Sequence, residues 1–259
     1  MNQIISVSDA VAIGLVFSRV IAFFITFPLI NSSFIPLNVR VMLVIAFSFF
    51  IFSLSSMKVP DIENISLTLL ALLILKELLI GFLLSVITQI FIAIFSYTAE
   101  IIGYFMGLTI ANLFDPTFGQ ISVLDRFFIL LFYLLFFVTG GYQFLIVGLI
   151  KSFEIIPLFD IHINTGIFEY ILLKSSLLFL LALKMSFPFV AILLLLNVAL
   201  ALVNRLIPQI NVFIVGLPMQ IFLGLLSLAI GASVVIYYGN HIMEMFVKIF
   251  LKAVKIVGG

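Results

Sequence analysis

The residues of this sequence that could do chemistry are ionisable side chains embedded in strongly apolar stretches. A charge at the centre of a bilayer costs at least ~2.5 kcal/mol on insertion scales, so such residues face protein, water or a partner charge. Their pattern indicates a polar conduit or a subunit interface. Seven residues belong to this set: Arg19, Lys76, Glu77, Glu100, Lys174, Lys184 and Arg205.

Some of the basic residues have an alternative position at the ends of membrane spans, where long side chains extend to the head groups. This alternative applies to Arg19, Lys174 and Lys184. The carboxylates of Glu77 and Glu100 have shorter stems and reach less far. Lys76 and Glu77 are neighbours in the chain, and we expect their side chains to point in different directions, because only residues three or four apart share a helix face.

The arrangement of these groups is not typical of an enzyme or a pump. His162 and His241 are isolated, and no run of several acids lies at one depth. The motifs of serine hydrolases, zinc proteases and P-loop nucleotide-binding proteins do not occur in the chain. The sequence therefore predicts neither catalysis nor a cofactor.

The composition predicts an all-α membrane protein. Of 259 residues, 65% are hydrophobic and 9% are charged, against roughly 25% charged residues in a soluble domain. The chain has no cysteine, which excludes disulfides and thiolate metal sites. A net charge of +1 gives no indication of nucleic-acid binding.

Apolar segments and their polar breaks predict six to eight membrane crossings of about 20 residues each. The segments are 10–30, 39–57, 66–113, 127–150, 167–203 and 212–247. Pro188 lies inside the fifth segment and predicts a kink. The basic tail after residue 247 predicts a cytoplasmic C-terminus by the positive-inside rule.

Segment 66–113 is too long for one ordinary crossing. It is either two crossings joined by a tight turn near residues 96–100, or one helix of ~70 Å at ~1.5 Å per residue that packs on protein. Small residues at steps of three or four favour close helix packing, and Gly103 with Gly107 forms a GxxxG step. Six residues are candidates for helix packing or a subunit interface: Glu77, Gly81, Ser85, Glu100, Gly103 and Gly107.

Two polar interruptions stand out between apolar segments. In residues 111–120, Asp115-Pro116 and Gly119 predict a sharp exit from a helix. Non-helical backbone at membrane depth is allowed where it is buried in protein or lines a cavity, although a plain surface loop is the alternative. The second interruption is a predicted turn with five polar or helix-breaking residues: Asn204, Arg205, Pro208, Gln209 and Asn211. Its alternative is an ordinary loop whose arginine lies at the head groups.

Ordered motifs along most of the chain resemble the FliR family, membrane components of the flagellar type III export gate and homologous to a virulence-secretion protein. The motifs are Ser18-Arg19, Glu77 to Gly81, Met106 to Leu108 with Asp115-Pro116, Gly140-Gly141, Ser152-Phe153, Pro157-Leu158, Asn204-Arg205, Pro208-Gln209, Asn211 to Phe213, and Gly216 to Pro218. The chain departs from the family at Ala201, where glycine is frequent, and at Tyr142 and Gln143, where many members carry histidine. The residues from Asn211 to Gly216 look more like the flagellar branch than the virulence branch.

The resemblance implies a subunit that assembles with FliP-like and FliQ-like proteins into a closed-pore channel for unfolded export substrates. It implies a FliP-like part over residues 1–165 and a FliQ-like helical hairpin over residues 166–259. It also implies contacts with membrane lipids and with FlhB-like, FlhA-like and rod-base proteins, in a flagellar basal body of the bacterial inner membrane, partly above the membrane plane on the periplasmic side.

By the same resemblance, residues 110–123 match a loop that plugs the closed pore. The candidates are Asn112, Phe114, Asp115, Pro116, Thr117, Phe118 and Gly119. A virulence-type export gate is the nearest alternative. A stand-alone secondary transporter would need inverted repeats around a midplane site, and the sequence has no clear repeat.

Overall fold

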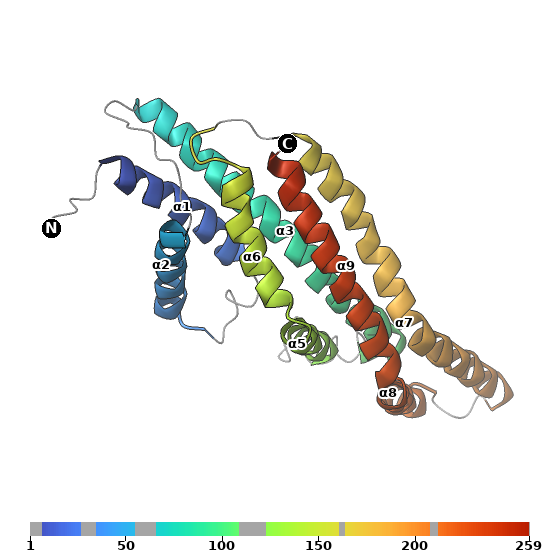
Figure 1. Cartoon of the computed structure of the whole chain (residues 1–259). Helices are drawn as coiled ribbons and strands as arrows, with labels where there is room; N and C mark the ends of the chain where they lie inside the picture. Colours follow the sequence, from blue (N-terminus) through green and yellow to red (C-terminus); the bar gives the residue numbers. More distant parts are fainter. Residues whose placement is uncertain are drawn as a thin grey trace. The chain divides into compact units, whose positions relative to one another are not determined.

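The computed structural model describes residues 7–26, 35–54, 66–108, 123–160, 164–207 and 212–258, and the ordered elements in these ranges are helices (Figure 1). The helices are α1 (Val7–Thr26), α2 (Leu37–Leu54), α3 (Leu67–Phe105), α5 (Val123–Val138), α6 (Gly141–Ile155), α7 (Gly166–Leu206), α8 (Val212–Ile230) and α9 (Ala232–Gly258). The all-α membrane class predicted from composition is confirmed.

Local polar residues set where the two longest helices begin. The hydroxyl of Ser66 accepts a hydrogen bond from the backbone N–H of Leu69 at 3.2 Å, just ahead of α3. The side-chain oxygen of Asn164 accepts one from the N–H of Gly166 at 2.9 Å, ahead of α7. Each bond satisfies a backbone donor that a helix N-terminus otherwise leaves unpaired.

Segment 66–113 forms one long helix as far as Phe105, so a turn near residues 96–100 is the wrong alternative. α3 has 39 residues, and 67% of its most apolar 18-residue stretch is buried. The corresponding share in α7, which has 41 residues and continues through Pro188, is 17%. α3 therefore packs mainly on protein, as its small residues predict.

Two of the predicted apolar segments are each broken by glycine. Segment 127–150 divides at Gly140, whose φ of +72° is a left-handed conformation that glycine adopts at no steric cost. Segment 212–247 divides at Gly231, and α8 and α9 meet there at 62°. A Cβ at Gly231 would lie 2.5 Å from the ring of Phe189, so the bend requires a residue without a side chain.

Fewer candidate spans are found by length and composition than the six to eight crossings predicted. Within the described ranges, α2, α3 and α7 are each long and apolar enough to cross a membrane, and up to five spans result if each bent pair counts as one. The number of true crossings stays a prediction.

Helices pack into two compact units. The first comprises residues 1–90, 140–173 and 245–259, and the second comprises residues 91–139 and 174–244. These units are defined by packing within the chain. The predicted division at residue 165 is a different one, between a FliP-like and a FliQ-like part, and it stays a prediction.

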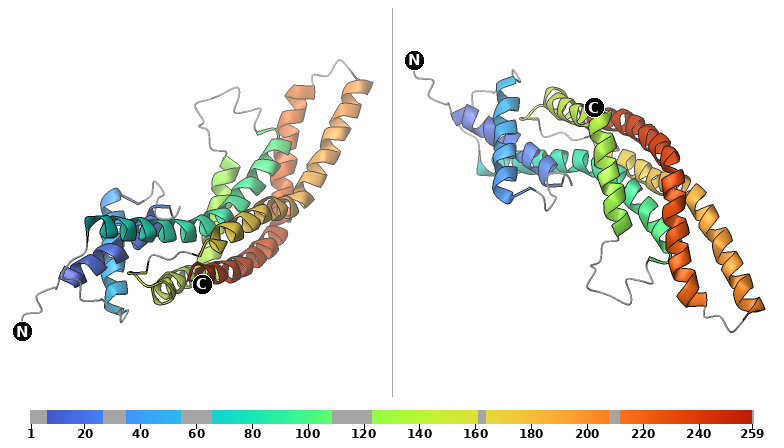
Figure 2. Two further views of the ribbon diagram at one scale, coloured as in Figure 1. Left: turned by 90° about the horizontal axis from the view of Figure 1, so that it is seen from above. Right: turned by 90° about the horizontal axis from the view of Figure 1, so that it is seen from below.

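Aromatic and glycine contacts build the core of each unit. In the first, α2 packs against α1, and the ring of Phe250 lies 6.3 Å from that of Phe23 and over the bare backbone of Gly148. In the second, Phe95 and Phe132 meet edge to face at 5.3 Å. Both views of Figure 2 show the C-terminal part of α7 beside α8, as an antiparallel pair.

Candidate functional site

One basic residue occupies the buried face of α1. Apolar residues recur on this face at steps of three and four, the spacing of one side of a helix. The buried set is Ala12, Leu15, Val16, Arg19, Val20, Phe23 and Phe24. Arg19 is fully buried in this row, so its charge must be satisfied by protein groups.

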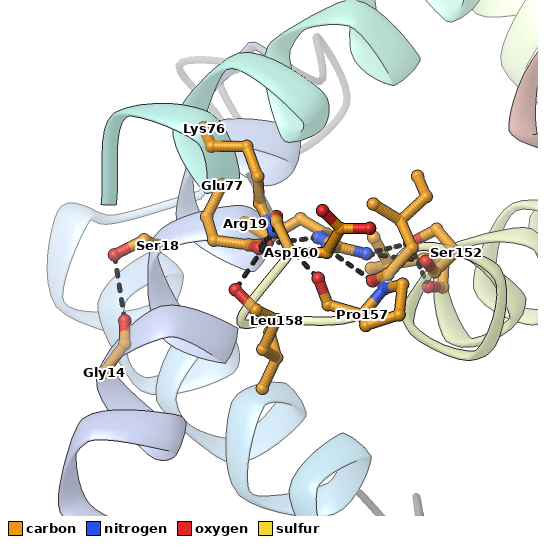
Figure 3. A network of polar contacts seen from close by, with 11 residues as sticks. Gly14, Ser18, Arg19, Lys76, Glu77, Ser152, Pro157, Leu158 and Asp160 are labelled. Carbon is orange, nitrogen blue, oxygen red and sulfur yellow. Dashed lines mark hydrogen bonds and ion pairs between the residues drawn. The ribbon is translucent and has the colours of Figure 1, made fainter. Parts of the chain in front are cut away.

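The guanidinium of Arg19 is surrounded by acceptors from two other helices (Figure 3). Its Nε donates to Oε2 of Glu77 at 2.5 Å. Its Nη1 donates to the carbonyl and hydroxyl of Ser152, at 2.7 and 3.1 Å, and Nη2 donates to the carbonyl of Ile156 at 3.1 Å. The ring of Phe153 lies 4.1 Å from Cζ, at cation–π distance.

The ammonium of Lys76 occupies a second polar cage beside the first (Figure 3). Its Nζ donates to the backbone carbonyls of Pro157, Leu158 and Asp160 at 2.8, 3.0 and 2.8 Å. Oε1 of Glu77 lies 2.7 Å from the same nitrogen. The carboxylate of Glu77 thus bridges the two cations, one on each oxygen.

These groups form a buried ion network around the C-terminal end of α6. The last carbonyls of a helix lack intrahelical partners and carry the negative end of the helix dipole, so cations are favoured there. We use the name "ion network" for Arg19, Lys76, Glu77 and their acceptors at Ser152, Ile156, Pro157, Leu158 and Asp160. It fastens α1 and α3 to the end of α6 inside one unit.

Gly81 makes the approach of α1 to α3 close enough for this network. It follows Glu77 by four residues and therefore lies on the same helix face. A Cβ at position 81 would overlap the backbone oxygen of Arg19 and lie 3.0 Å from Cβ of Ala22. The missing side chain lets the two backbones touch where Arg19 reaches Glu77.

For the charged residues, one of the two alternatives for Arg19 and the expectation about Lys76 and Glu77 are wrong. Arg19 is not at a head-group position, because it is fully buried and bonded to protein. Lys76 and Glu77 do meet although they are neighbours, because the long lysine side chain turns back to the carboxylate. Glu100 and Lys184, by contrast, are exposed.

The remaining candidates for an interface lie within the packing of this chain, and their role toward other subunits stays a prediction. Ser85 and Gly103 are buried on α3. Gly107 follows α3 with a φ of +75° and faces the side chains of Leu217 and Gln220 on α8.

Several predicted residues fall outside the described residues. This applies to the whole set of plug-loop candidates, from Asn112 to Gly119, and to Pro208, Gln209 and Asn211 of the predicted turn. Asn204 and Arg205 lie exposed in the last turn of α7.

Sequence reasoning missed the partners of the buried cations. Most of them are backbone carbonyls, which every residue has, so no side-chain pattern marks them. One signal was available: Ser18-Arg19, Glu77 to Gly81, Ser152-Phe153 and Pro157-Leu158 are the same stretches that carry the family resemblance, and five of their residues belong to the ion network.

The ion network is suited to holding helices together, because its charged groups face one another or carbonyls. It presents no nucleophile beside a base. In the described part of the chain, no group of three or more His, Asp or Glu residues is placed to hold a metal ion.

Comparisons with known proteins agree with the motifs. Residues 10–246 match the family described as bacterial export proteins, family 1. The chain is 33% identical to the flagellar biosynthetic protein FliR of Aquifex aeolicus, covering 96% of each chain. It is 34% identical to FliR of Bacillus subtilis over 100% of this chain and 99% of that one, and 31% identical to FliR of Escherichia coli over 87% and 86%. By this match over nearly its whole length, the chain belongs to the bacterial export proteins, family 1.

Proposed function

We propose that this protein is a subunit of the membrane export gate for flagellar proteins. The observation that carries the proposal is the match to flagellar FliR proteins over essentially the whole chain. The ion network supports it, because residues of four motifs meet in one fixed structure without a reactive centre.

In this proposal the chain assembles with FliP-like and FliQ-like subunits around a channel for unfolded flagellar proteins. FlhB-like, FlhA-like and rod-base proteins contact the assembly, which lies in the basal body of the inner membrane and partly on its periplasmic side. The subunit acts without catalysis, and its basic C-terminal tail lies in the cytoplasm.

Exposed apolar side chains support an assembly in which helices face lipid or other subunits. α2 exposes Phe49, Phe50 and Leu54 by more than half, and α7 exposes Leu172 and Leu195 by 71% and 69%. Exposing this much apolar surface to water is unfavourable, and lipid chains or neighbouring helices would cover it.

Co-purification tests the proposal directly. We expect this chain, co-expressed with the FliP-like and FliQ-like proteins of its own organism, to form one detergent-stable particle whose mass by native mass spectrometry includes all three. If the other two assemble and this chain stays alone, the proposal fails and an isolated transporter becomes the better hypothesis.

The plug loop has its own test in that particle. We expect deletion of residues 112–119 to make vesicles carrying the complex leaky to ions, because the deleted residues would no longer occlude the pore. The measurement is ion flux from reconstituted vesicles, with the intact complex as reference. Unchanged permeability in a complex of unchanged composition would remove the plug role.

A further inference from the structure

We infer that Gln220 on α8, held by Asn197 on α7, is a positioning residue for the end of α3. The inference rests on the proposed function, because the proposed plug, whose candidates run from Asn112 to Gly119, follows that end in the sequence. It assigns a role to a polar pair that lies outside the ion network and belongs to the second unit.

The pair joins two otherwise apolar helices. Nε2 of Gln220 donates a hydrogen bond to Oδ1 of Asn197, and both side chains are half-buried. An amide that loses its partner in apolar surroundings is costly, so each residue restricts the conformation of the other. Such bonds between membrane helices fix which residues face each other along the helices.

The other end of the Gln220 amide faces the last residues of α3. A Cβ at Gly107 would lie 2.9 Å from Oε1 of Gln220 and 3.2 Å from Cδ1 of Leu217. The N–H of Gly107 donates to the carbonyl of Tyr104 at 3.0 Å, and its φ of +75° ends the helix in a left-handed conformation. The backbone of Gly107 therefore leaves α3 directly against the amide of Gln220.

A second contact on the same face of α8 supports this junction. Met106 is buried, with 1% of its surface exposed, and lies over Gly224, four residues after Gln220. A Cβ at Gly224 would lie 2.5 Å from Cγ of Met106 and 2.7 Å from its sulfur. Consecutive residues at the end of α3 thus fit consecutive turns of α8.

Asn197 and Gln220 have different roles, because a glutamine side chain is flexible unless a partner holds it. A glutamine alone changes rotamers easily, and its amide would not hold a neighbouring backbone in place. Bonded to Asn197, it presents Oε1 in one position toward Gly107. Asn197 acts on the end of α3 through Gln220, so the register of α7 against α8 sets the position of Gly107.

The test is the double variant Asn197→Leu with Gln220→Leu in the co-purified complex. Replacing both partners removes the hydrogen bond without leaving an unpaired amide, a change that is nearly neutral for stability. We expect a particle of unchanged mass and several-fold faster ion leakage from vesicles. Gln143→Leu, the same replacement at an exposed site of α6, is the control and should not leak.

A distance measurement tests the inference without reference to the plug. The chain has no cysteine, so Tyr104→Cys and Met219→Cys, both at exposed sites, introduce one spin-label pair between α3 and α8. We expect a narrow distance distribution in the parent and a broader one in the double leucine variant.

The outcomes separate this inference from the proposed function. If the loop deletion leaks while the double leucine variant stays tight with an unchanged distance distribution, the positioning role is wrong and the proposed function stands. If the parent chain does not assemble with its partners, the proposed function fails. The distance measurement then tests the inference by itself, and a distribution that is no broader in the double leucine variant than in the parent would overturn it.

Discussion

Glu77→Ala is expected to destabilise the protein by about 3–5 kcal/mol, the usual cost of removing one partner from a buried ion pair. The carboxylate lies between two buried cations, 2.5 Å from Nε of Arg19 and 2.7 Å from Nζ of Lys76. Without it, two positive charges remain close together in an apolar interior. Because a whole domain is stable by only about 5–15 kcal/mol, we expect a large loss of assembled complex.

The measurement is the apparent unfolding temperature of the detergent-purified complex, together with its yield. Glu244→Ala is the control, because it removes the same side chain from an exposed site, on α9. Surface substitutions of that kind change stability by about 0.5 kcal/mol or less. Equal behaviour of the two variants would show that the ion network contributes little.

The same geometry ranks the members of the network. Lys76→Met removes one cation but leaves the pair of Arg19 and Glu77 intact, so its cost should be smaller than that of Glu77→Ala. Arg19→Met should cost more than Lys76→Met. It removes the bond to Glu77 and also leaves the carbonyl of Ile156, the hydroxyl of Ser152 and the ring of Phe153 without their cation.

Gly81→Ala is the second substitution with a large expected effect. The added Cβ would overlap the backbone oxygen of Arg19, which cannot turn aside as a side chain could. α1 must then move away from α3, which lengthens the bond between Arg19 and Glu77. We expect a loss of about 1–3 kcal/mol or more from overpacking, in addition to the weakened ion pair.

Gly14→Ala provides the control for this change. A Cβ at Gly14 meets nothing within 4 Å, so the same substitution in α1 should be neutral or stabilising by up to about 1 kcal/mol through helix propensity. The two variants are compared by unfolding temperature and by yield of the complex. A Gly81 variant as stable as the Gly14 variant would mean that the helices adjust without cost.

Much of the fold was predictable because its causes are local. The apolar composition indicated the all-α membrane class, and the absence of proline between residues 66 and 105 left one long helix as an alternative that the structure confirms. The breaks at Gly140 and Gly231 were not predictable in the same way. Glycine inside an apolar run is compatible with both a continuous helix and a bend, and tertiary contacts such as the ring of Phe189 against Gly231 decide which forms.

The site was only partly predictable because its contacts are long-range. Arg19, Lys76 and Glu77 could be picked out from the sequence, because each is an ionisable residue within an apolar segment. Their acceptors lie 81 to 137 residues away, as with the carbonyls of Pro157 and Ile156. No periodicity links such distant positions.

The use of main-chain acceptors has a consequence for how this protein can change in evolution. Carbonyl oxygens at positions 156–158 and 160 are present whatever residue occupies the position, so binding the two cations places no demand on the side chains of this turn. Positions 19 and 77 have no such freedom. Exchanging the two charges would place a carboxylate at position 19 against carbonyl oxygens. We therefore expect the exchange of arginine and glutamate between positions 19 and 77 to be destabilising. The network therefore constrains the charges at positions 19, 76 and 77 more than the side chains of the turn that receives the cations.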